Sequence, residues 1–82
     1  MKLSKHAEMR MNQRGMSLEK VRFIYTYGES LAAPGKAVLK RISKRDLPAL
    51  ESHRSVSGAL LDKVLHRTLV MDQTESTVIT VY

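Results

Sequence analysis

The sequence predicts an α+β domain in which two N-terminal helices pack on a small, mostly antiparallel β-sheet. Residues 5–27 carry helix-forming residues between capping signals, whereas residues 64–71 alternate apolar and polar side chains and residues 77–82 are rich in β-branched residues. A chain of 82 residues can bury one modest core. We therefore expect a single domain over residues 1–82, with a short additional helix before a C-terminal hairpin.

The first helix is expected over residues 5–14. Ser4 suits its N-cap, because the hydroxyl can accept a hydrogen bond from the first turn, and Gly15 suits the C′ position. Ala7 and Met11 fall on one apolar stripe of this helix. One face of the helix is therefore available for the core.

The second helix is expected over residues 18–27, between the N-cap Ser17 and the C′ residue Gly28. Phe23 and Tyr27 form an i, i+4 aromatic pair that can stack on bases, but a second packing surface against the sheet is the simpler interpretation. The face expected to meet the core consists of Leu18, Val21, Ile24 and Tyr25.

The middle of the chain gives weaker signals. Residues 33–35 predict a turn, residues 36–42 a strand, and residues 46–50 a short helix with a proline in its first turn. Residues 55–58 have the composition of a loop. Residues 59–62 can extend either a helix or the following strand, so this part of the prediction stays open.

The C-terminal third predicts an antiparallel hairpin. Residues 64–71 alternate apolar and polar side chains, residues 72–76 are polar, and residues 77–82 are rich in β-branched residues. We expect the last strand to lie inside the sheet, with Tyr82 at the end of the sheet.

His6, Arg10 and Arg14 form the most informative pattern in the chain. Side chains four residues apart lie on one face of a helix, and this face borders the apolar stripe. The three side chains can together hold a phosphate. Two alternatives remain open: solvated arginines that stabilise the helix C-terminus, and side chains that fix the helix onto the sheet.

The overall charge points to a polyanionic partner. Fourteen Lys and Arg residues against eight acids give a net charge of +6 and a sequence pI of about 10.0. Such a surface attracts nucleic acid or an acidic protein, although composition alone does not separate specific binding from non-specific attraction.

Several function classes are unsupported by the sequence. The absence of cysteine excludes disulfides and thiolate chemistry, and His6, His53 and His66 lack the spacing of metal ligands. The isolated glycines form no phosphate-binding loop. No signal region and no apolar stretch of about 18 residues is present, so we expect a cytoplasmic protein without metal, cofactor or membrane partner.

Residues 6–17 carry the pattern His-Ala-x-x-Arg-x-x-x-Arg-Gly-Met-Ser, and residues 78–82 read Val-Ile-Thr-Val-Tyr. With two short helices and a central strand, this pattern resembles a family of small uncharacterised bacterial domains grouped with RelE-like toxins. The resemblance implies a RelE/barnase-like fold and kinship to metal-independent ribonucleases. Residues 53–62 depart from the family pattern as extra material before the last hairpin.

Metal-independent RNA cleavage needs a base for the 2′-hydroxyl, an acid for the leaving oxygen, and cations for the transition state. His6 is our candidate base or acid, Arg10 and Arg14 are candidate phosphate clamps, and Tyr82 is a candidate second proton-transfer group. Arg67 or His66 are alternatives for that second group. The residues expected to bind nucleic acid are Arg10, Arg14, Lys40, Arg41 and Arg67.

Two functions therefore follow from the sequence. The first is a RelE-like domain that cleaves or binds RNA and is held in check by an acidic, antitoxin-like protein. The second is a non-catalytic basic module that binds nucleic acid or a partner protein. The sequence does not select an oligomeric state.

Overall fold

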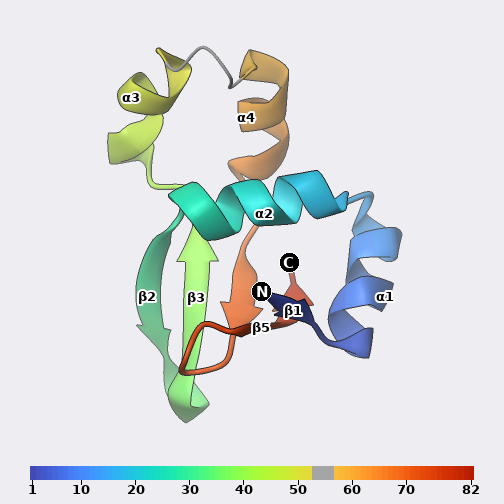
Figure 1. The fold of residues 1–82 in the computed structure, drawn as a ribbon. Helices are drawn as coiled ribbons and strands as arrows, with labels where there is room; N and C mark the ends of the chain where they lie inside the picture. The colour runs from blue at the N-terminus through green and yellow to red at the C-terminus, as the bar shows by residue number, and fades with distance from the viewer. Residues whose placement is uncertain (53–56) are drawn as a thin grey trace.

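The computed structural model describes residues 1–52 and 57–82 and confirms an α+β fold. Figure 1 shows α2 crossing one end of the strands, α1 beyond β5, and α3 and α4 on the far side of α2 from the sheet. The elements are β1 (Lys2–Leu3), α1 (Lys5–Arg14), α2 (Leu18–Tyr27), β2 (Glu29–Ala33), β3 (Ala37–Arg41), α3 (Leu47–Glu51), α4 (Gly58–Val64), β4 (Leu69–Met71) and β5 (Thr77–Val81).

Both N-terminal helices begin as their capping residues predict. The Ser4 hydroxyl accepts a hydrogen bond from Ala7 N at 3.0 Å, and Gly15 ends α1 in the left-handed region with φ 64°. Gly28 plays a different role from the one expected, because its φ of −75° is accessible to any residue. A Cβ there would overlap Ile24 O and lie 3.1 Å from Arg41 O, so glycine allows α2 to approach β3 closely.

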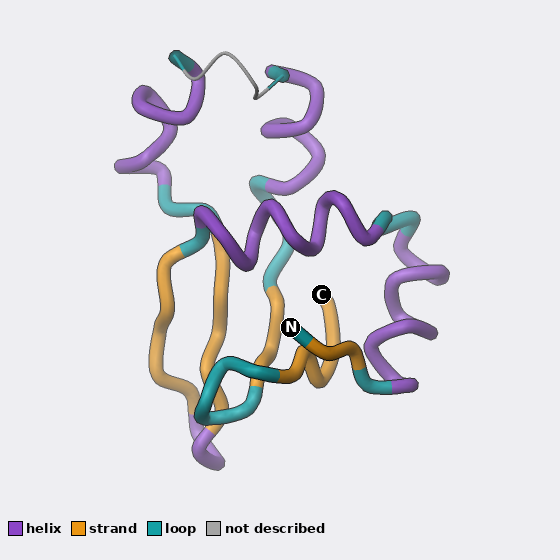
Figure 2. The backbone as a smooth tube through the Cα atoms, viewed as in Figure 1, coloured by secondary structure: helices purple, strands orange, loops and turns teal. Residues whose placement is uncertain are grey.

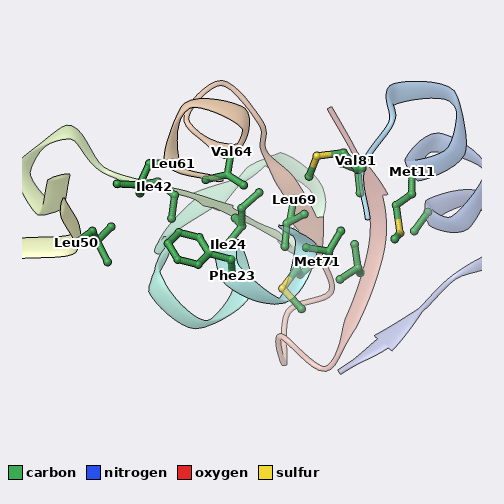
Figure 3. Close-up of a cluster of buried hydrophobic side chains, with 14 residues drawn as sticks. Met11, Phe23, Ile24, Ile42, Leu50, Leu61, Val64, Leu69, Met71 and Val81 are labelled. Carbon is green, nitrogen blue, oxygen red and sulfur yellow. The ribbon is translucent and has the colours of Figure 1, made fainter. Parts of the chain in front are cut away.

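The core-facing surface of α2 differs from the prediction at Leu18. Val21 and Ile24 are buried as expected, whereas Leu18 is 43% exposed. Phe23 is also buried, which favours the predicted second packing surface over base stacking for this residue. Figure 3 shows Phe23 between Leu50 and Ile24, with Ile42 and Leu61 nearby. The reason is that α2 is covered on two sides, by the sheet and by α4, so its buried surface is wider than a single stripe.

The sheet has the strand order β1-β5-β4-β3-β2, and only the β1–β5 pair among the described strands is parallel. The sequence missed β2 because Glu, Ser and Ala have low strand propensity, and it missed β1 because that strand is only two residues long. The turn before β3 is present, with Gly35 at φ 76°.

The predicted strand over residues 64–71 is wrong in its first half. Val64 is the last residue of α4, and the strand β4 contains only Leu69–Met71. The Ser57 hydroxyl caps this helix by accepting a hydrogen bond from Leu60 N, and Leu61 is buried three residues before Val64. Figure 2 shows this helix leading through a turn into the sheet. The helix predicted over residues 46–50 is confirmed as α3. Of the loop predicted over residues 55–58, residues 55 and 56 lie outside the described residues, and the prediction for Gly58 is wrong because that residue begins α4. His53 also lies outside the described residues.

The last strand lies inside the sheet, between β1 and β4, as predicted. Met71 pairs with Val78 and Val70 pairs with Thr80, so Ile79 is an extra residue that forms a bulge. The bulge lets Val78 and Val81, three residues apart, both point into the core, where neither is exposed. A regular strand would place them on opposite faces.

Helix length and apolarity also bear on the predicted location. None of the helices in the described part of the chain is both long and apolar enough to cross a membrane. Residence in the cytoplasm stays a prediction.

Candidate nucleic-acid interface

A groove of about 440 Å³ opens where the end of α1, the start of α2 and the end of α4 meet. We call it the basic groove. Arg14 and Lys20 line one side of it, and Lys63, His66 and Arg67 line the other. The side chains thus come from segments about 50 residues apart in the sequence, and only the fold brings them together.

Hydrogen bonds to backbone carbonyls position the two arginines of the basic groove. Arg14 Nε donates to Val81 O at 3.2 Å, which ties the end of α1 to the end of β5. Arg67 donates from its guanidinium to Arg14 O, also at 3.2 Å. That bond places a cation at the C-terminus of α1, where helix carbonyls favour positive charge. Each guanidinium carries five N–H donors, so donors remain for a ligand.

The charge of the basic groove is strongly unbalanced. Four cationic side chains, Arg14, Lys20, Lys63 and Arg67, line it together with one carboxylate, Asp62. With His66 neutral the groove carries +3, half of the net charge of +6 of the chain. Among the described residues the ion pairs are Lys40–Glu75 and Arg45–Glu29, and neither involves a groove cation.

The predicted stripe of His6, Arg10 and Arg14 divides into two parts. His6 is exposed, and its Nε2 lies 3.5 Å from Arg10 Nε, while the Arg10 guanidinium also donates to Gln13 Oε1 at 3.2 Å. Eight residues separate His6 from Arg14, which corresponds to about 12 Å along a helix. Of the three, only Arg14 lines the basic groove.

Tyr82 lies near the basic groove rather than near His6. Its backbone N donates to Thr68 O at 2.9 Å, and Thr68 N donates to Tyr82 O at 3.2 Å, so Tyr82 sits opposite the residue that follows Arg67. Its side chain is 57% exposed at the end of the sheet, as the sequence predicts. The structure therefore brings Arg14, Arg67 and Tyr82 together from three segments.

A family model described as Domain of unknown function (DUF4258) matches residues 3–82, which include the whole basic groove. The chain belongs to the DUF4258 family. Comparisons with curated proteins and with solved structures found no match. The family description names no activity, so the grouping of this DUF4258 member with RelE-like toxins stays a prediction.

The remaining predicted contacts of this DUF4258 member lie elsewhere. Lys40 Nζ is 3.2 Å from Glu75 Oε1, donates to Tyr25 O and lies over the Tyr25 ring, and its side chain is only 13% exposed. These contacts favour a structural role for Lys40. Arg41 is exposed and lines a second cavity, which shares His66 with the basic groove.

Lys20 and Lys63 are the groove residues that the sequence did not single out. A signal for Lys63 existed: Ser57 is a good N-cap, and Leu61 and Val64 have helical spacing. If a helix is predicted from these signals, Lys63 falls about one helical turn before His66. No sequence signal distinguishes Lys20 from the other basic residues of α2, because its place in the groove depends on where α4 packs.

Proposed function

We propose that this domain binds single-stranded RNA by holding its phosphates in the basic groove. The observation that carries the proposal is the concentration of four cations with one carboxylate in a groove of about 440 Å³. Arginine donates two parallel hydrogen bonds to phosphate, and lysine adds a point charge. The resemblance to RelE-like toxins supports RNA as the polyanion. An acidic, antitoxin-like protein that covers the same groove would compete with RNA.

The test uses fluorescence anisotropy with a single-stranded oligouridylate over a range of salt concentrations. Lys63→Ala removes an exposed groove cation, and Lys5→Ala is the matched control because Lys5 is an exposed lysine at the start of α1, outside the groove. For single strands, each lost phosphate contact reduces the slope of log affinity against log salt by about 0.7. We expect this change for Lys63→Ala alone. Equal slopes for the two variants contradict the proposal.

Metal-independent cleavage of the bound RNA is a second candidate function. The observation that favours it is His66, which lines the basic groove together with Arg14 and Arg67. An imidazole can activate the ribose 2′-hydroxyl, and two guanidiniums can stabilise the negative charge that develops on the phosphate. The backbone of Tyr82 pairs with Thr68, the residue after Arg67, so its phenol is the candidate proton donor for the leaving oxygen. His6, the histidine that the sequence favours, lies outside the groove.

Cleavage is tested with single-stranded RNA in the presence of EDTA, comparing His66→Gln with His6→Gln. Both histidines are exposed, so each substitution removes one imidazole with little effect on the fold. Loss of a general acid or base lowers the rate by about 10²–10⁴-fold. We expect this loss for His66→Gln. The same loss for His6→Gln alone would return the site to the sequence-based choice, and RNA binding without any cleavage would support the non-catalytic module.

A further inference from the structure

A second cavity adjoins the basic groove and differs from it in chemical character. It has a volume of about 360 Å³ at the ends of β2 and β3. Apolar surface comes from Ile42, Leu47 and Leu65, and polar or charged groups come from Glu29, Arg41, Ser43, Lys44 and His66. His66 lines both cavities, so they meet at this residue.

A cavity that combines apolar surface with several polar groups suits a flat organic ligand whose edges carry hydrogen-bonding groups. A nucleotide has a phosphate and a base, which require different surroundings. The basic groove suits the phosphate, and the second cavity suits the base, which single-stranded RNA can turn outward. This step rests on the proposed RNA binding, because the groove supplies the phosphate contacts.

Glu29 and Arg41 determine which base fits best. They are direct partners in the register of β2 and β3, so their side chains leave the same face of the sheet side by side. Arg41 can donate two hydrogen bonds to the guanine acceptors O6 and N7. The Glu29 carboxylate can accept from the guanine donors N1–H and N2–H. Cytosine, adenine and uracil each lack one of these two sets.

The ion pair already present at Glu29 does not block this recognition. Arg45 contacts only Oε2 of Glu29, at 3.1 Å, and the Arg45 side chain is 85% exposed. Such surface pairs contribute little and exchange readily with water or a ligand. We infer that the cavity lined by Glu29 and Arg41 is a base-binding site with a preference for guanine.

The test measures binding of the four ribonucleoside 3′-monophosphates by titration calorimetry. We expect guanosine 3′-monophosphate to bind about tenfold more tightly than the other three, since a bidentate contact discriminates by at least this factor. Glu29→Gln should reduce the preference to below about threefold, and Arg41→Lys should weaken it while keeping the charge. Glu51→Gln, an exposed carboxylate outside this cavity, is the control and should keep the preference.

Hexauridylate binding, measured in parallel, separates this inference from the proposed function. Binding of hexauridylate without a guanine preference overturns the base site and leaves the groove proposal intact. A guanine preference that Glu29→Gln abolishes, without hexauridylate binding, supports the base site and contradicts the groove. A preference that survives both Glu29→Gln and Arg41→Lys, or no binding of any nucleotide, overturns the base site.

Discussion

Two charged regions of the molecule use their side chains in opposite ways. In the first, which we call the paired cluster, Lys40 and Glu75 form an ion pair, and Ser30 and Tyr25 complete the surrounding hydrogen bonds. In the second, the basic groove, the cations meet backbone carbonyls and one carboxylate. The paired cluster is electrostatically closed, and the basic groove is open to an anion.

The carboxylates in and beside the paired cluster show how complete its pairing is. Backbone hydrogen bonds from Thr77 and Ser76, with side-chain bonds from Ser76 and Thr74, hold the pKa of Asp72 below its usual value. The hydrogen bond from the Ser30 hydroxyl, followed by the contact with Lys40, lowers the pKa of Glu75. Unbalanced charge, rather than charge itself, therefore marks the candidate interface.

The largest expected effect is a difference in folding stability between two variants of the basic groove, Arg14→Ala and Lys63→Ala. Arg14→Ala removes the bond to Val81 O, and one hydrogen bond contributes about 1 kcal/mol to the free energy of unfolding. Lys63→Ala should change it by less than about 0.5 kcal/mol. Urea denaturation measures both. Equal stabilities would show that the hydrogen bond from Arg14 to Val81 O contributes nothing to the stability of the fold.

The second prediction concerns acid stability at the paired cluster. Because the folded-state pKa of Glu75 is lowered, its stabilising charge is fully present above the ordinary pKa of 4.5 and is lost as the pH falls through the lower folded value. Wild type should therefore be more stable than Glu75→Gln at pH 7, with a gap that narrows as the pH falls from about 5 through the lowered folded pKa. Thermal unfolding across this range measures the gap. A constant gap would contradict a role for the charge.

The smallest expected effect is on RNA affinity at the paired cluster. Lys40→Met removes a cation that the sequence places on the nucleic-acid surface, but its ammonium group is already engaged by Glu75. We expect oligouridylate affinity to stay within about twofold of wild type at 0.15 M salt, where distant charges are screened. Lys63→Met should weaken binding more. A larger loss for Lys40→Met would contradict the distinction between the paired cluster and the basic groove.

Local signals in the sequence determined much of the fold. Ser4 and Ser17 cap their helices by bonding to amides three residues away, and Gly35 takes the left-handed conformation of the predicted turn. The β-branched residues of β5 predicted a strand inside the sheet. These features depend on neighbours in the chain, so a single sequence is enough to predict them.

The tertiary structure determines which cations remain available to bind an anion. Nothing local distinguishes Lys40 from Lys63, yet Lys40 faces a carboxylate 35 residues further along the chain and Lys63 lines the basic groove. Arg14 reaches Val81, 67 residues away, and Arg67 reaches back to Arg14. The bulge at Ile79 likewise depends on pairing with β4. Local signals in the sequence predict the two N-terminal helices, β3, α3, β5 and the excess of positive charge, whereas long-range packing determines where that charge is left unpaired.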